Sequence, residues 1–294
     1  MRGVTLIELV VVIVLIGIIV GATVFFVFPL RQGVDLVARA ELTDIADNAM
    51  QRIGRDVRLA LPNSVRKDGT GKLIEFLSIR AAGRYRADLG SVSGGTNCPN
   101  TDTALGQPGN DQLSFDTVVD TCFKSIGSVP NANTITTSDF LVLNNYGPDF
   151  TGQDAYATSG TSNRRQISAL ASEGSRERID LTSSVAFDRT LHDSPGKRFY
   201  VISGPVSYVC DTTARTITRY SGYSIAAAQP TPPTGATSVA LIADNVTGCI
   251  FDYSANVAPQ IGLLTLRLTL AKTLSGGESE SVSLYHAVHV SNVP

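Results

Sequence analysis

The feature that most constrains the fold of this chain is an uncharged run near its N-terminus, from Leu9 to Leu30. An α-helix rises about 1.5 Å per residue, so about 20 residues cross the roughly 30 Å hydrocarbon core of a bilayer. The run therefore predicts a helix long and apolar enough to span a membrane. The remainder of the chain is then expected to fold outside the bilayer.

An acidic residue, Glu8, stands immediately before this run. An ionised carboxylate inside a membrane is costly unless it is paired, so an acid in such a segment indicates function. A secretory signal peptide has a shorter apolar region followed by a small-residue cleavage site, and no such site follows Leu30. A plain membrane anchor fits the length but leaves Glu8, and the glycine at position 3, unexplained.

Residues 3–13 read GVTLIELVVVI, and this segment resembles the class III signal of type IV pilins and type II secretion pseudopilins. The resemblance implies that a prepilin peptidase cuts on the cytoplasmic side, between Gly3 and Val4. It also implies that the new amine of Val4 is methylated and that Glu8 is the acid used in filament assembly. The chain departs from the family at Val4, where phenylalanine is usual, and this puts methylation more in question than cleavage.

The resemblance further implies that Glu8 pairs with the N-terminal amine of a neighbouring subunit in the filament. Such pairing removes two isolated charges from an apolar core, and the loss of one partner strands the other. Gly17 and Gly21 form a Gly-x-x-x-Gly pair that permits close approach of helices. Glycine is also simply common in membrane helices, so both interpretations of this pair stay open.

Residues 31–61 continue as a predicted amphipathic helix, which Pro62 ends. Its charged residues include Arg52, Arg55 and Arg58, but Asp44, Asp47 and Asp56 interleave with the basic residues of this segment and the net charge of the chain is −2. We therefore expect a solvated face and no nucleic-acid partner. The apolar positions recur at spacings of three and four: Val34, Ala38, Leu42, Ile45, Ala49, Ile53, Val57 and Ala60.

Residues 62–294 are rich in Ser, Thr, Gly, Asn and Pro, with short β-rich runs. Strands are predicted at 73–79, 140–143, 199–210, 216–220 and 249–253. Leucines alternate with polar residues at 264–270, and a second alternation spans 282–290, so a Gly276-Gly277 turn between them predicts an antiparallel hairpin. Segments 90–111, 144–173 and 226–238 are expected to be loops.

The predicted fold class is α+β and pilin-like, with a long N-terminal helix followed by an antiparallel β-rich head. We divide the chain into a leader peptide at 1–3, a transmembrane or filament-core helix at 4–30, an amphipathic helix at 31–61 that packs on the head, and a globular domain at 62–294. The head is long enough to bury a core of its own.

The chain has four cysteines, and these allow three disulfide pairings. All four follow the membrane run, and a location outside the cytoplasm favours disulfides. We favour Cys98–Cys122, which would close a loop-rich insert, and Cys210–Cys249, which would join two strand ends; each would contribute about 2–4 kcal/mol. A zinc site is the alternative, but the chain has neither a Cys-x-x-Cys motif nor a histidine near a cysteine in sequence.

The histidines give little support for an enzyme. There are three, His192, His286 and His289. On a strand, residues 286 and 289 point to opposite faces, and His286 falls in the apolar phase, as a core histidine does. Asp111, Asp116 and Asp120 could hold Ca²⁺, but their spacing fits no EF-hand, so solvated loop positions are expected. No catalytic residue and no cofactor or metal is predicted.

Four further patches carry a second resemblance: residues 59–66 (LALPNSVR), 206–211 (VSYVCD), 219–223 (RYSGY) and 286–294 (HAVHVSNVP). They resemble the protein O family of mannose-sensitive hemagglutinin (MSHA) pilus biogenesis, whose members are large minor pilins of Gram-negative bacteria. This resemblance implies a minor pilin that helps initiate an MSHA-type type IV pilus or sits at its tip. It implies an inner-membrane protein with a periplasmic head that later reaches the cell surface.

The partners implied are the prepilin peptidase, the major pilin, other minor pilins and the inner-membrane assembly platform. Two alternatives stay open. A minor pseudopilin of type II secretion, of the J-like size class, shares the same signal. A tip adhesin would use the long Gly-, Ser- and Asn-rich loops to bind a glycan or a surface.

Overall fold

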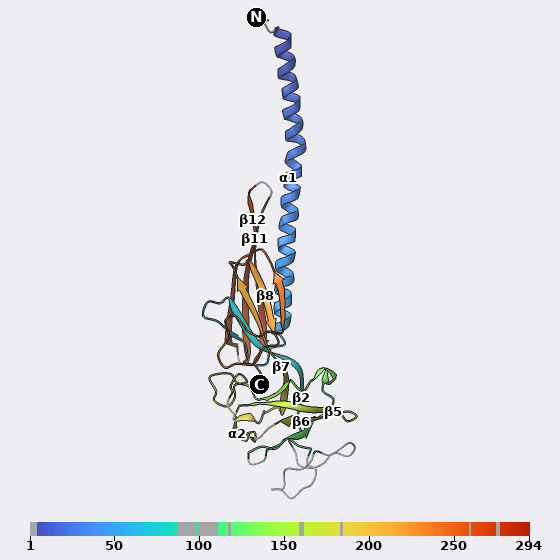
Figure 1. The fold of residues 1–294 in the computed structure, drawn as a ribbon, viewed down its shortest axis with the longest axis vertical. Helices are drawn as coiled ribbons and strands as arrows, with labels where there is room; N and C mark the ends of the chain where they lie inside the picture. The colour runs from blue at the N-terminus through green and yellow to red at the C-terminus, as the bar shows by residue number, and fades with distance from the viewer. Residues whose placement is uncertain are drawn as a thin grey trace.

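A computed structural model describes residues 5–87, 98, 111–116, 119–158, 162–182, 185–258, 260–274 and 277–294. The proposed cleavage site between Gly3 and Val4 lies outside these residues, as does most of the loop expected at 90–111. In the described part, one long helix joins an antiparallel β-rich head (Figure 1). The predicted α+β class, with an N-terminal apolar helix before a β-rich domain, is confirmed.

The helix α1 runs without a break from Leu6 to Val57, 52 residues, about 80 Å at 1.5 Å per residue. It ends before the expected position at residue 61. The chain turns there because the N–H groups of Leu59 and Ala60 donate to the carbonyls of Asp56 and Val57. Ala60 then pairs with Ser78 as an isolated β-bridge.

The last three strands form a separate antiparallel sheet in the order β10 (Val246–Ala258), β11 (Ile261–Thr273), β12 (Ser279–Ser291). The predicted C-terminal hairpin is confirmed, and Leu266 lies opposite His286 in its register. The apolar phase of β11 is buried at Leu264, Leu266, Leu268 and Leu270. Figure 1 shows this hairpin lying alongside α1 and reaching toward the N-terminal half of the helix.

The second sheet has nine strands, in the order β1-β2-β7-β4-β5-β6-β3, and β8 and β9 branch from β7. Strand β2 (Leu73–Arg84) and strand β7 (Arg198–Asp211) are long and paired. The other bounds are β1 Arg66–Lys67, β3 Cys122–Lys124, β4 Phe140–Leu143, β5 Arg164–Ser172, β6 Glu177–Thr182, β8 Thr216–Ser221 and β9 Ser238–Ala243.

The five predicted strands are all present, four in this sheet and the fifth, 249–253, within β10, but one expected loop is wrong. Residues 144–173 contain β5, which pairs with both β4 and β6. The apolar residues of β5 are few, and only Arg165 and Ile167 of this strand are buried. Because its neighbours supply most of the backbone hydrogen bonds, β5 forms without a strong sequence pattern.

The head has two main hydrophobic clusters. One lies between α1, the end of β7 and the sheet β10–β12. The other lies in a distal lobe, built around β3, β4, β5 and β6, at the end of the molecule opposite the N-terminus (Figure 1). Two short helices belong to this lobe: η2 (Ala132–Thr134) and α2 (Arg189–His192), whose N-cap Asp188 accepts from the Thr190 N–H.

Candidate assembly helix

The N-terminal half of α1 projects away from the head (Figure 1). The window from Leu6 to Thr23 has a mean hydropathy of 2.9 and buries none of its residues in the rest of the molecule. By length and composition, this part of α1 could cross a membrane. The coarse expectation of an apolar N-terminal helix able to span a bilayer is therefore supported.

Apolar side chains surround this half of the helix on every side. Each large apolar residue between Leu6 and Val20 exposes about half or more of its surface. A helix that is apolar all round is stable in lipid or among other helices, whereas a helix on the surface of a soluble domain keeps a polar face. This half of α1 thus requires an apolar environment that the described part of the chain does not provide.

Glu8 is the single charged residue of this window and lies in the first turn of α1. Its side chain is exposed, and no basic side chain within the described residues forms an ion pair with it. The positive end of the helix dipole favours a carboxylate in the first turn. Glu8 is therefore presented at the helix tip, where a cation from outside the molecule can reach it.

Gly17 and Gly21 lie on one side of this half, four residues apart. A Cβ atom added at either position would meet nothing within 4 Å. Among the described residues nothing packs against these glycines, and the surface around them is open. Their use as a site of close helix approach remains a prediction about neighbouring subunits.

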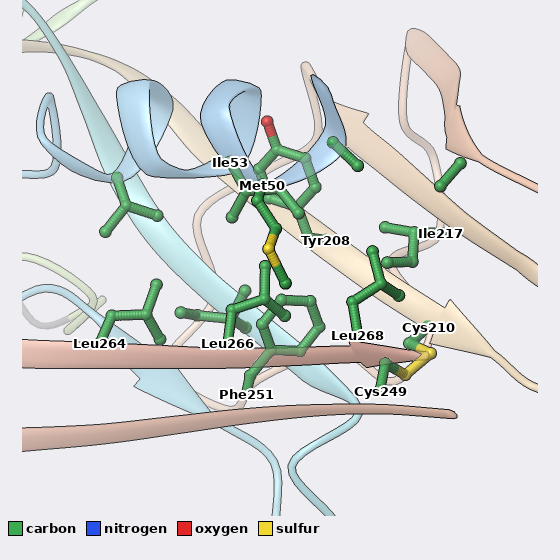
Figure 2. Packing of buried hydrophobic residues seen from close by; sticks show 14 of the residues in the cluster. Met50, Ile53, Tyr208, Cys210, Ile217, Cys249, Phe251, Leu264, Leu266 and Leu268 are labelled. Atoms are coloured by element: carbon green, nitrogen blue, oxygen red, sulfur yellow. A yellow bond between two sulfur atoms is a disulfide. The ribbon is translucent and has the colours of Figure 1, made fainter. Parts of the chain in front are cut away.

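The C-terminal half of α1 is held firmly by the head. Met50 and Ile53 point from the helix toward Phe251, Leu264 and Leu266 of the sheet (Figure 2). The helix approaches the sheet most closely at Gly54. A Cβ atom there would lie 3.1 Å from both His286 Nε2 and Val288 Cγ2. Glycine at this position lets the backbone of α1 come close to β12.

Near its end, α1 is also tied to the head by Asp56. Its Oδ2 accepts from Arg219 Nε at 2.8 Å and from the Tyr208 hydroxyl at 2.7 Å. Burial, followed by the Asp56 carboxylate, raises the pKa of Tyr208 well above its usual range. Asp56 was expected on a solvated face, which is wrong for this residue because β7 and β8 bring its two partners to the helix. Asp44, Asp47, Arg52, Arg55 and Arg58 are exposed as expected.

Both favoured disulfides are present. Cys98–Cys122 lies in the distal lobe, with a Cα–Cα distance of 5.4 Å. Cys210–Cys249 joins β7 to β10 at the edge of the cluster beneath α1, with a Cα–Cα distance of 6.5 Å (Figure 2). The second disulfide therefore links the two sheets of the head at the place where α1 packs.

The three histidines lie in different places. Buried His192 accepts from the Asp188 N–H at Nδ1, 3.0 Å, and its Nε2 lies 2.8 Å from the Gly152 carbonyl. Burial lowers the pKa of His192 below its usual value. His286 is half-buried against α1 and His289 is exposed, on opposite faces of β12. Across the described residues, no group of three or more His, Cys, Asp or Glu side chains could hold a metal ion.

The three aspartates expected as solvated loop residues are placed differently, and that expectation is wrong for two of them. Asp111 is fully buried, 3.3 Å from Lys124 Nζ. Asp120 is buried and accepts from the N–H groups of Ser114 and Cys122. Asp116 is exposed and pairs with Arg189. The partner of Asp116 lies in a distant segment, and the burial of Asp111 and Asp120 depends on what packs over them, so sequence spacing could not reveal either.

Comparison with known proteins adds no family to this description. No family model matches the chain, and no curated protein or solved structure matches it either.

Proposed function

We propose that this chain is a minor pilin that helps to initiate or cap an MSHA-type type IV pilus. The observation that carries the proposal is the division of α1 into two halves. One half is apolar all round, buries nothing in the head and bears Glu8 at its tip. The other half is part of the core of the head.

This division supports a subunit that changes its surroundings during assembly. Before assembly, the half from Leu6 to Thr23 would lie in the inner membrane, with the head on the periplasmic side. After the prepilin peptidase cuts between Gly3 and Val4, the same half would move from lipid into a bundle of neighbouring helices. Lipid and a bundle of apolar helices both keep the apolar side chains away from water, so the transfer has only a small cost in free energy.

The exposed carboxylate of Glu8 would control this transfer. In the filament it would pair with the N-terminal amine of a neighbouring subunit, and an unpaired charge in that apolar core would be strongly unfavourable. Correctly placed subunits are thereby selected. The contacts supplied by the assembly platform, the major pilin and other minor pilins would act on the same half of α1.

Two further features fit an extracytoplasmic head at the end of a filament. Two disulfides are typical of proteins in oxidising compartments. The distal lobe extends the head away from the helix (Figure 1). Such a head would crowd a repeating lattice but could occupy the tip.

The first test is intact mass and N-terminal sequencing of the protein from its native membrane, with and without the prepilin peptidase. We expect a mature chain that begins at Val4, heavier by one methyl group if methylated, and an uncut precursor without the peptidase. A chain that still begins at Met1, or that is cut beyond Leu30, contradicts the proposal.

The second test replaces Glu8 by alanine and follows the protein into sheared surface pili. Glu8→Ala should be cleaved normally but should be missing from the pili. The matched control is Asp47→Ala, an exposed acid in the half of α1 that packs on the head, and it should be incorporated normally. Normal incorporation of Glu8→Ala would refute the pairing role. A deletion strain that keeps its pili but loses protein secretion would instead identify a pseudopilin.

A further inference from the structure

The distal lobe contains a closed cluster of one amine and two carboxyl groups. Lys124, on β3, is 0% exposed, and its Nζ lies 2.9 Å from Glu173 Oε2 and 3.3 Å from Asp111 Oδ1. The Asp111 side chain is also 0% exposed, and that of Glu173 is 10% exposed. Burying ionised groups in this way is costly, so a step that removes charge from the cluster is favoured.

Backbone hydrogen bonds hold the three groups in place from three different segments. The Lys124 N–H donates to the Asp111 carbonyl at 2.9 Å, so these two main chains lie side by side. Glu173 follows β5, and its N–H donates to the Arg176 carbonyl at 2.8 Å in the turn that leads to β6. The disulfide Cys98–Cys122 closes the same region, and Asp111 Oδ1 accepts from the Cys98 N–H at 3.4 Å.

We propose that Lys124 and Asp111 join in an intramolecular amide bond, formed by the folded protein itself with Glu173 as the proton carrier. The Glu173 carboxylate takes a proton from the Lys124 ammonium. The free Nζ then attacks Cγ of Asp111, an N–C bond forms, and a C–O bond of the carboxyl group breaks. The oxygen leaves as water.

The step balances without an added reagent. Of the three protons on the ammonium group, one stays on the amide nitrogen and two leave with the Asp111 oxygen. Glu173 transfers these protons and ends ionised, as it began. The products carry one positive and one negative charge fewer than the reactants, and a closed interior favours this change.

The geometry assigns different roles to the two carboxyl groups. Glu173 makes the shorter contact to Nζ, at 2.9 Å, which suits proton transfer. Asp111 is fully enclosed and fixed beside Lys124 by the backbone hydrogen bond. Its Oδ1 lies 3.3 Å from Nζ, so the carboxyl group is held beside the nucleophile that would attack its Cγ.

The bond would act as a second covalent cross-link in the distal lobe, next to the disulfide, and unlike the disulfide it would survive reduction. It would fasten the segment before β3 to β3 itself. This inference does not depend on the proposed pilus function, because the chemistry needs only the folded lobe.

Trypsin provides a direct test, because the sequence between Arg86 and Arg164 contains Lys124 as its single cleavage site. The purified full-length protein is reduced, alkylated, denatured and digested. The amide blocks cleavage at Lys124, so we expect one peptide, 87–164, lighter by one water than its sequence mass. Fragmentation should place the link between Asp111 and Lys124. Two free peptides, 87–124 and 125–164, or an amide to any other residue, would overturn the proposal.

A variant tests the role of Glu173. Glu173→Gln removes the proton carrier but keeps the size of the side chain, and it should give the two separate peptides at full mass. The matched control is Glu177→Gln, a buried acid whose carboxylate accepts from the Ser172 hydroxyl, and it should keep the amide. Amide formation at the wild-type level in Glu173→Gln would refute the assigned role, and the wild-type digest decides the existence of the bond by itself.

Discussion

The two halves of α1 are equally helical but meet the rest of the protein in opposite ways. Between Leu6 and Thr23, apolar side chains cover the whole circumference and none is buried. Beyond residue 38, apolar residues occupy one stripe, and that stripe is buried against the head. The difference teaches that the arrangement of apolar residues around a helix decides whether it joins a core of its own chain or needs an outside partner.

The largest effect on the free energy of unfolding is expected for a substitution in the buried apolar stripe of α1. Ile53→Ala should lower the free energy of unfolding of the head by about 2–5 kcal/mol, because it leaves a cavity between α1 and the sheet. Ile13→Ala, in the exposed half, should leave it unchanged. Urea unfolding in detergent, followed by tyrosine fluorescence, measures both, since all nine tyrosines follow residue 61. Equal effects of the two changes would abolish the distinction between the halves.

Two glycines sharpen the same comparison. Gly54→Val places a side chain against His286 and Val288, and overpacking of this kind costs about 1–3 kcal/mol. Gly17→Val enters open space and should not alter the stability of the head in detergent. Thermal unfolding monitored by circular dichroism compares them. A head that keeps native stability with Gly54→Val would show that α1 is not closely packed there.

The contact of Tyr208 with Asp56 predicts that the head becomes less stable to unfolding at alkaline pH. The pKa of Tyr208 is raised on folding from the usual value of 10.0, so the folded state keeps its proton where the unfolded state loses it. The contribution of this tyrosine to the free energy of unfolding is fully present below pH 10. Above that pH it should fall by about 1.4 kcal/mol per pH unit. Urea midpoints at rising pH should fall less steeply in Tyr208→Phe. The exposed Tyr285→Phe should keep the wild-type slope.

The smallest effect is expected where α1 leaves the head. Arg39 pairs with Glu280, and Glu41 with Lys272, so two exposed ion pairs join the helix to the C-terminal hairpin. Arg39→Ala should cost less than about 1 kcal/mol, and the loss should shrink further in high salt. Urea unfolding at low and high ionic strength checks this. A large, salt-independent loss would show that the packed half of α1 extends further toward the N-terminus.

Much of the fold could be predicted from sequence because the signals were local. The long helix, the strands at 140–143 and 216–220, and the C-terminal hairpin follow from periodicity and turn residues. Strand β5 was missed because its own pattern is weak and its pairing partners β4 and β6 define it. Close packing at Gly54 was missed, although a glycine inside a helical pattern is a signal for it.

The candidate site also has features that could be predicted from sequence and features that could not. The position of Glu8 at the start of an apolar helix can be read directly from the chain, since both features lie within one turn. The partners of Asp56 and Lys124 could not be predicted, because Arg219 and Glu173 come from distant segments. Burial of a charged residue depends on which segments pack against it, and the spacing of residues in the sequence does not indicate those segments.

By itself, the sequence determined a helix with two kinds of surface, a β-rich head and the position of one acid at the helix tip. These depend on the periodicity of neighbouring residues, which a single chain segment contains. Only the tertiary structure decided which part of α1 is buried, how two sheets share the head through Cys210–Cys249, and which charged groups meet in the distal lobe. Those contacts join residues far apart in sequence, and folding alone brings them within reach.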